Sequence, residues 1–292
     1  MFATANSLAR RFTHPMIVST RQWKGNVETS VGAFVVLNRD GWIVTTAHAF
    51  GLAAKAQADA PKVAALAARI AELRAGPDTP ADRLAREVAK LERSADPGWI
   101  TNISTWCGRD RLTLRDVRAV PAADIAIGRL DPVPADMVAS LPVLKNPTVG
   151  IEPGRSLCRL GYAFTKVKAT FDESAGSFRV QGEVPFFPLE GMFTRIVDAG
   201  RTPDGKFAIR FIETSSPGLR GQSGGPLFDV EGRIWGIQSR TAHLALGFNP
   251  EAEIAGVKTQ VPQFINLGLA VHAGTLIEIL ADAGIAHEVS PD

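Results

Sequence analysis

The chain has 292 residues, of which 45% are hydrophobic and 21% charged, so it can bury a sizeable core as one large domain or two small ones. Its 32 basic and 30 acidic residues leave a formal charge of only +2, which argues against a nucleic-acid partner. No apolar run approaches the roughly 18 residues that cross a bilayer, and the N-terminus lacks the apolar segment of a signal peptide. We therefore expect neither membrane insertion nor export.

The two cysteines, Cys107 and Cys158, are few for a secreted protein of this size, which would often use several disulfides. Their small number favours a reducing compartment and a cytoplasmic location, while a single bridge between them stays an alternative. No Cys/His cluster has the spacing of metal ligands, so we expect no metal and no other cofactor.

The first part of the chain, residues 13–49, has the pattern of β-strands. The runs PMIVST, VGAFVVL and WIVTT are rich in β-branched residues, and the turn sequence Asn38-Arg39-Asp40-Gly41 separates the last two. These features predict a β-meander.

Residues 51–97 have a different composition, rich in Ala, Leu, Arg and Glu. Apolar side chains recur there at helical spacing in two sets, which are Leu66, Ile70 and Leu73, and then Leu84, Val88 and Leu91. The connector of residues 76–80 offers a stop for one helix and Asp78 or Thr79 as N-cap of the next. The pattern predicts an antiparallel helical hairpin over residues 53–94, inserted into a β protein.

After Pro97 the short strand signals return, and they continue at near-regular intervals to about residue 239, as in a barrel or a sandwich. The proline-rich stretch of residues 132–153 is the best candidate for a crossing between two β units. A final helix is predicted over residues 273–283. We accordingly divide the chain into residues 1–140, which include the helical hairpin, and residues 141–292, which end in the helix.

The segment Gly221-Gln222-Ser223-Gly224-Gly225-Pro226 is the strongest local signal for chemistry. Glycines around a serine let the backbone turn sharply, expose the hydroxyl and aim successive N–H groups into one concavity. Ser223 is therefore the candidate nucleophile. An ordinary glycine-rich turn with a solvent-facing serine is the alternative, because turns favour the same residues.

A serine hydroxyl needs a neighbouring base to act as a nucleophile at neutral pH. Of the five histidines, only His48 lies at the end of a strong predicted strand, although a structural or solvated role is common for a histidine in that setting. The base in turn needs a buried acceptor. Asp124 opens the apolar run Ile125-Ala126-Ile127 and fits that role, with a turn aspartate at a strand start as the alternative.

The segments TTAHAF, ADIAIGRL and GQSGGPLFDVEGRIWGIQS, in the order His, Asp, Ser, resemble the three signature blocks of the chymotrypsin-like (trypsin-like) serine endopeptidases. They are most similar to the bacterial Deg-type branch. The resemblance implies an all-β fold with a helical insertion, in which two six-stranded antiparallel β-barrels pack side by side. The helical hairpin would lie between the histidine and the aspartate, and a helix would end the chain.

The resemblance also implies a serine endopeptidase that cleaves protein or peptide substrates through an acyl-enzyme, with His48 as base, Asp124 orienting it and Ser223 as nucleophile. The N–H groups of Gly221 and Ser223 would form the oxyanion hole. Substrate-binding residues would be Pro217, Ser239, Arg240 and Thr241.

Three departures from the family pattern bear on activation and specificity. Gln222 stands where zymogen-type members have an aspartate, Pro217 replaces the acid that would select Arg or Lys, and the helical hairpin is extra. Small or medium aliphatic side chains at P1, the substrate residue before the cleaved bond, are therefore expected. An acidic P1 side chain is the alternative if Arg240 or His243 turns inward.

Two other functions remain open at this stage. In the first, the chain is a latent protease-fold effector that becomes active in a complex, and a regulatory protein docks on the hairpin of residues 53–94. Alternatively, it would be an inactive β-barrel binding module. The helical hairpin would otherwise be a decoration whose apolar stripes cover one another or the barrel.

Overall fold

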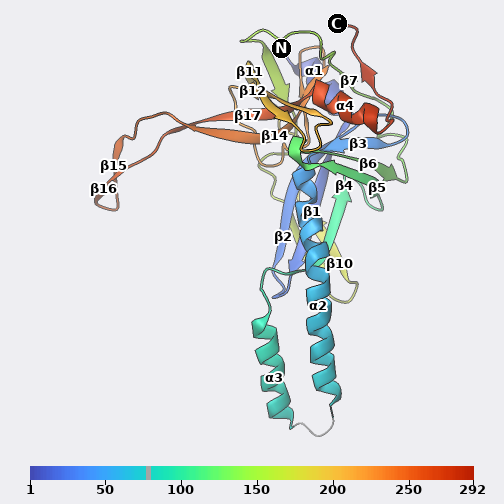
Figure 1. The fold of residues 1–292 in the computed structure, drawn as a ribbon, viewed down its shortest axis with the longest axis vertical. Helices are drawn as coiled ribbons and strands as arrows, with labels where there is room; N and C mark the ends of the chain where they lie inside the picture. Colours follow the sequence, from blue (N-terminus) through green and yellow to red (C-terminus); the bar gives the residue numbers. More distant parts are fainter. Residues whose placement is uncertain (77–79) are drawn as a thin grey trace.

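Two curled β-sheets form the body of the protein in the computed structural model, which describes residues 1–76 and 80–292 (Figure 1). The first is an antiparallel sheet of six strands in the order β4-β1-β2-β3-β6-β5. Its strands are β1 (Thr13–Gln22), β2 (Val27–Val36), β3 (Trp42–Thr45), β4 (Ile100–Cys107), β5 (Thr113–Val120) and β6 (Ile125–Asp131).

The second sheet closes into a barrel, because the short strand β13 pairs with both β8 and β14. The ring of six antiparallel strands consists of β8 (Ser156–Arg159), β11 (Leu189–Arg201), β12 (Ala208–Thr214), β17 (Phe264–His272), β14 (Ile234–Ala245) and β13 (Pro226–Phe228). Two short parallel strands that the sequence does not predict, β7 (Val143–Leu144) and β18 (Glu288–Val289), extend it beyond β14. The prediction of two six-stranded antiparallel β-barrels with a helical insertion and a final helix is confirmed as to fold class, and among the described residues the first unit is a curled sheet whose edge strands β4 and β5 are not paired with each other.

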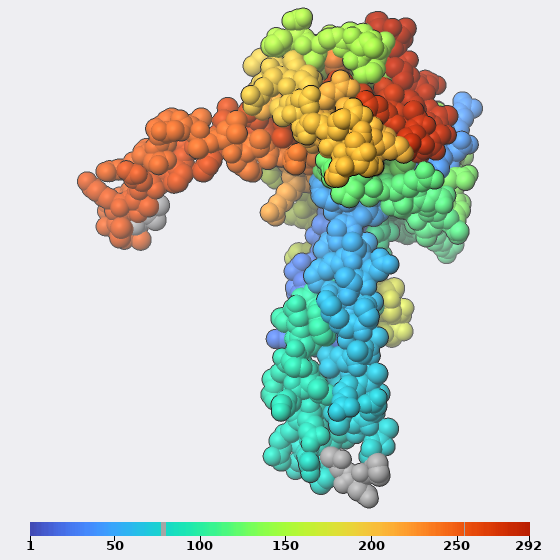
Figure 2. Space-filling model, in the orientation of Figure 1, coloured from blue at the N-terminus to red at the C-terminus, as the bar shows by residue number. Residues whose placement is uncertain are grey.

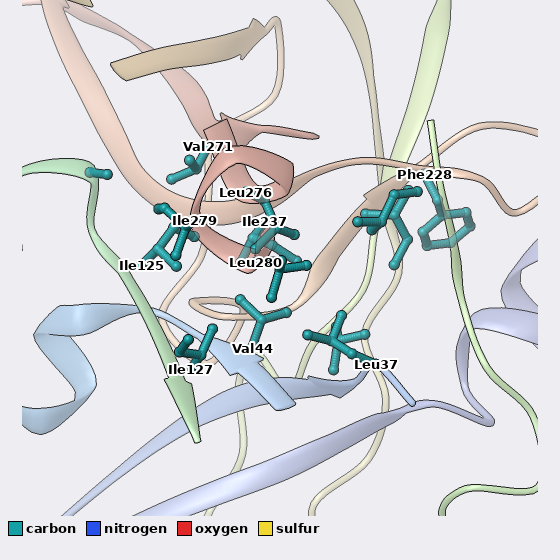
Figure 3. Close-up of a cluster of buried hydrophobic side chains, with 14 of the residues drawn as sticks. Leu37, Val44, Ile125, Ile127, Phe228, Ile237, Val271, Leu276, Ile279 and Leu280 are labelled. Carbon is teal, nitrogen blue, oxygen red and sulfur yellow. The ribbon is translucent and has the colours of Figure 1, made fainter. Parts of the chain in front are cut away.

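One apolar core joins the two halves (Figure 3). Side chains alternate between the faces of a strand, so Val44 of β3 and Ile125 and Ile127 of β6 point to the same side of the first sheet. There they meet residues of the second barrel and of the last helix, α4 (Ala273–Asp282): Ile237, Val271, Leu276, Ile279 and Leu280. The opposite face of the first sheet has its own core around Met16, Val18, Phe34, Val36 and Ile43.

The predicted helical hairpin is present as an arm that projects from the body (Figures 1 and 2). After the short turn η1 (Ala47–Phe50), it consists of α2 (Gly51–Ala75) and α3 (Ala81–Ser94), and we call it the helical arm. Ile70 and Val88, from the two predicted apolar stripes, are its most buried hydrophobic side chains. Pro80 precedes α3, and the predicted caps Asp78 and Thr79 lie outside the described residues.

The helical arm is anchored to β4 by the carboxylate of Asp59, which is only 4% exposed. This carboxylate accepts hydrogen bonds from the side chain of Lys55 and, at 3.1 Å, from the backbone N–H of Ile100. Lys55 also donates to the carbonyl of Gly98 at 2.6 Å. A single polar cluster therefore fixes the base of the arm.

A second projection is formed by the ends of β14 and β17 and the small hairpin β15 (Glu251–Ile254) and β16 (Val257–Gln260), and we call it the β arm (Figures 1 and 2). The sequence does not predict β15 and β16. Another small hairpin, β9 (Lys168–Asp172) and β10 (Ser177–Gln181), lies beside β2. The remaining elements are α1 (Ala3–Ala9) and the turn η2 (Pro121–Ala123). Within the described residues, no helix is long and apolar enough to cross a membrane.

Candidate active site

The loop that carries Ser223 is shaped by three glycines that lie against the backbone of neighbouring segments. A Cβ atom on Gly221 would lie 2.2 Å from the carbonyl oxygen of Tyr162, and one on Gly224 would lie 2.0 Å from that of Ala33. Gly225 is equally confined, because its Cβ would lie 1.9 Å from the carbonyl oxygen of Leu160. Such short distances exclude any side chain at these positions. Glycine is therefore required for the loop to lie between the two sheets.

Two N–H groups of this loop are free to bind a ligand. Gly221 has φ +94°, as the third residue of a type II turn requires, and the turn is closed by Gln222 N donating to Leu219 O at 3.0 Å. The carbonyl of Gly221 is used, since it accepts from Tyr162 N at 2.8 Å. Within the described residues, the N–H groups of Gly221 and Ser223 have no hydrogen-bond acceptor.

The pairing of β3 with β6 brings His48 and Asp124 together. Thr45 lies opposite Ala126 in that pair, so the residues just beyond Thr45 and just before Ala126 become neighbours. His48 Nδ1 is 2.9 Å from Asp124 Oδ2, and the backbone N–H of His48 donates to Oδ1 of the same carboxylate at 3.0 Å. Asp124 has φ 53° and ψ 38°, a left-handed conformation that aspartate tolerates better than most residues.

Hydrogen bonding tunes both members of this pair. The bond to Asp124 raises the pKa of His48 above its ordinary value, although burial opposes the effect. Burial pushes the pKa of Asp124 upward, but the hydrogen bonds from His48 and from the hydroxyl of Ser239 outweigh it and leave the pKa low. An ionised Asp124 holds the Nδ1 proton of the imidazole, which leaves Nε2 able to accept another proton.

Ser223 and His48 line the same cleft but are not hydrogen-bonded to each other within the described residues. The hydroxyl of Ser223 donates instead to the carbonyl of Ser239 at 3.3 Å. His48 Nε2 lies 3.5 Å from the hydroxyl of Thr46. This cleft has a volume of about 760 Å³ and also contains Gly221, and we call it the His48 cleft. Rotation of the Ser223 side chain about Cα–Cβ changes which acceptor its hydroxyl faces.

A second cleft of about 540 Å³ adjoins Ser223, and we call it the Thr241 cleft. Its lining brings together all four residues predicted to bind substrate, namely Pro217, Ser239, Arg240 and Thr241. The hydroxyl of Thr241 donates to the carbonyl of Gly218 at 2.6 Å, which fixes one wall. The guanidinium carbon of Arg240 lies 4.6 Å from the ring centre of Phe211, and His243 Nδ1 is 2.6 Å from Asn266 Oδ1.

Two other acids between His48 and Asp124 in the sequence, Asp110 and Asp116, have different surroundings. Asp110 accepts a hydrogen bond from the indole of Trp106 at 2.8 Å, and Asp116 is exposed at the irregular part of β5. His272, another of the five histidines, caps α4 by accepting from Gly274 N. Both cysteines are free and buried. In the part of the chain that the structure describes, no group of three or more His, Cys, Asp or Glu could hold a metal ion.

Two further residues shape the site, Gln222 and Arg159, and the sequence did not lead us to expect this role for either. Gln222 is fully buried, and its side chain accepts from Leu219 N at 3.0 Å and donates to Phe187 O at 3.2 Å, which braces the Ser223 loop. Its position next to Ser223 was the available signal. Arg159 is buried behind Pro217, and no local sequence signal distinguishes it from a surface arginine on a strand.

Known proteins resemble this chain at two levels, in solved structures and in a family model. Solved structures with a similar course of the chain include the active form of the Rv3671c protease from M. tuberculosis, with 14% identity, a TM-score of 0.49, and coverage of 98% of this chain and 86% of that chain. Another is the HtrA-type protease AlgW with a tripeptide, with 17% identity, a TM-score of 0.46, and coverage of 98% and 65%. No curated protein sequence matches the chain significantly. The sequence model of the trypsin-like peptidase domain matches residues 32–237, which is more than two thirds of the chain. The protein therefore belongs to the trypsin-like peptidase family.

Proposed function

We propose that the protein is a serine endopeptidase whose catalytic residues are His48, Asp124 and Ser223. One observation carries this proposal: the His48–Asp124 pair and the glycine-shaped Ser223 loop, from opposite halves of the molecule, meet at one cleft. The backbone N–H groups of Gly221 and Ser223 also support it. Within the described residues neither has an acceptor, so both can donate to an oxyanion formed beside the Ser223 hydroxyl.

The proposed reaction begins when the substrate carbonyl enters the His48 cleft and Ser223 Oγ turns toward His48. His48 Nε2 takes the hydroxyl proton as Oγ bonds to the carbonyl carbon, and the oxyanion accepts hydrogen bonds from Gly221 and Ser223. Each such donor contributes roughly 2.7–4 kcal/mol in other serine proteases. His48 then protonates the leaving amine, the C–N bond breaks, and water attacks the acyl-enzyme by the same steps.

A fluorophosphonate probe tests this proposal, because it phosphonylates only a serine that is activated for nucleophilic attack. We expect one adduct per chain, mapped by mass spectrometry to Ser223, and no adduct in Ser223→Ala. Labelling should weaken strongly in His48→Ala. An adduct on another serine, or an unlabelled but folded wild-type protein, would contradict the assignment and favour an inactive β-barrel binding module.

A latent protease that a partner activates is a second candidate, favoured by the hydrogen bond from Ser223 to the carbonyl of Ser239. We propose that the regulatory protein docks on the helical arm, residues 53–94. This form of the proposal predicts slow labelling of the purified protein and faster labelling when the partner is added. Equal rates in both conditions, or stimulation that survives replacement of the arm by a short linker, would count against it.

We also place the protein in the cytoplasm, on the ground that its two buried cysteines are free. Fractionation of the producing cells, with marker enzymes for each compartment, tests this placement. Recovery of the protein with the exported fraction would contradict it.

A further inference from the structure

Arg159 is a buried cation that forms no ion pair with any residue that the structure describes. Its side chain is 1% exposed, and its Nη1 donates to the carbonyl of Ser216 at 2.8 Å and also to the carbonyl of Pro217. Its Nη2 donates to the hydroxyl of Thr214. All of these acceptors are neutral. Within the described residues its Nε has no acceptor at all.

Such an arrangement is energetically unfavourable for the protein by itself. Burial lowers the pKa of Arg159 to about 10, which still leaves the guanidinium protonated at neutral pH. A buried charge is normally compensated by an ion pair, and neutral carbonyl groups only partly replace one. Glu213 is the next residue to Thr214 in the sequence, but its carboxylate is bound by Arg195.

The position of Arg159 relates this charge to the substrate. Pro217, whose carbonyl it binds, lines the Thr241 cleft together with Ser223. Gly268 gives the guanidinium its space, since a Cβ there would lie 2.5 Å from Nη2. Arg159 thus lies directly behind the wall of the cleft that adjoins the nucleophile.

The lining of the Thr241 cleft adds charge of the same sign. Arg220 and Arg240 both line it, and among the described residues that do so there is no Asp and no Glu. Two guanidinium groups in the lining and a third behind its wall, with no acidic side chain among the described lining residues, favour an anion in this cleft, and low-dielectric walls strengthen such an attraction.

We propose that the Thr241 cleft binds an acidic P1 side chain, glutamate or aspartate, and that Arg159 is a specificity-determining residue acting through the cleft wall. The inference rests on the proposed peptidase function. It replaces the aliphatic P1 residue expected from Pro217, Ser239 and Thr241, because those three uncharged side chains do not set the potential of the cleft. The incoming carboxylate supplies the negative charge that Arg159 lacks.

Peptide pairs that differ only in P1 glutamate or P1 glutamine test the proposal, because the two side chains have nearly the same shape. We expect kcat/KM to be about tenfold or more higher for glutamate. In Arg159→Met this ratio should fall toward one, and in Arg220→Gln it should fall by less. The matched control is Arg179→Gln, at an exposed arginine of β10 that is paired with Asp172 of β9, and it should keep the wild-type ratio.

Binding to the Ser223→Ala protein provides a readout that does not depend on turnover. Product peptides ending in P1 glutamate or glutamine both carry a terminal carboxylate, so calorimetry of the two isolates the side chain. Tighter binding of the glutamate peptide supports the cleft assignment even if Arg159→Met fails to fold. Two results in a protein that labels at Ser223 would overturn the specificity proposal: equal binding of the two peptides, or a preference for glutamine, leucine or arginine at P1. Either result leaves the peptidase proposal intact. In a third outcome, the wild-type protein neither reacts with the fluorophosphonate nor cleaves the peptides, while the glutamate peptide still binds more tightly. That combination would refute only the peptidase function.

Discussion

The Ser223 loop and the helical arm are held in opposite ways. In the loop, Gly224 and Gly225 are pressed against the backbone of both sheets, so that a single added Cβ atom would collide with a carbonyl group. In the helical arm most side chains are exposed, and Gly51 at its start has nothing within 4 Å of an added Cβ. The comparison shows that tertiary contacts specify the conformation of the loop, whereas local helix formation and the Asp59 cluster specify that of the arm. Substitutions in the two regions should therefore differ greatly in effect.

The largest effect is expected at the centre of the loop, in Ser223→Ala. Removing the hydroxyl should lower peptide turnover by several orders of magnitude, because the acyl-enzyme cannot form. The thermal midpoint should stay close to that of the wild type, since the substitution removes a single partly exposed atom. Turnover within about tenfold of the wild type would exclude Ser223 as the nucleophile.

Asp124→Asn should lower turnover at neutral pH by roughly 10³ to 10⁴, because an amide does not hold His48 in the required tautomer. The pH profile gives a second readout. Since Asp124 raises the pKa of His48, wild-type kcat/KM should fall as the pH drops through a value above 6.5, the ordinary pKa of histidine. In Asp124→Asn the residual activity should fall at a lower pH. An unchanged profile would show that another group orients His48.

Gly224→Ala tests whether close backbone contact determines the loop. The new Cβ would lie 2.0 Å from the carbonyl oxygen of Ala33, at a residue with φ +85°. We expect the free energy of unfolding to drop by about 3 kcal/mol or more, with loss of fluorophosphonate labelling. Gly205→Ala is the matched control, because φ is +70° but the space around it is open, and its cost should be about 1–2 kcal/mol. Similar losses in the two variants would disprove the contact argument.

The smallest global effect is expected in the helical arm, from Asp59→Asn. This change should speed hydrogen exchange at the start of α2 and in β4, because the hydrogen bonds from Lys55 and Lys62 are weakened. Peptide turnover should remain near the wild-type rate. Glu72→Gln, which breaks only the exposed pair with Arg69, is the control and should leave exchange unchanged. Equal exchange in both variants would show that the Asp59 cluster does not anchor the arm.

The same cluster predicts a pH dependence of the arm. The hydrogen bond from Lys55, together with those from Ile100 and Lys62, holds the pKa of Asp59 at about 2 against the opposing effect of burial. A lowered folded-state pKa stabilises the arm at pH values above the ordinary 3.8 and loses that effect as the pH falls from there toward 2. The protection of α2 amides, taken as their exchange rate relative to that of an unfolded peptide at the same pH, should therefore fall over that range in the wild type and much less in Asp59→Asn.

Several features of the fold lay outside what the sequence could predict, for identifiable reasons. β7 and β18 contain two residues each, too few to show a period, and each pairs with a strand distant in the sequence, β7 with β14 and β18 with β7. β15 and β16 lie far along the β arm, where no buried face imposes an alternation of polar and apolar residues. The direction of the Ser223 hydroxyl depends on the carbonyl of Ser239, a neighbour that only the fold supplies.

The sequence by itself determined the longer strands of both sheets, the two helices of the arm and the glycines around Ser223. These are local properties, since periods of two or 3.6 residues and the need for positive φ are visible within a few positions. Tertiary structure decided the closure of the second barrel by β13 and the meeting of His48 with Asp124 through the β3–β6 pair. It also decided that Arg159 lies buried behind Pro217 with no carboxylate among the described residues to pair with it. Whether a charge is paired depends on residues distant in the chain, and only packing brings these together.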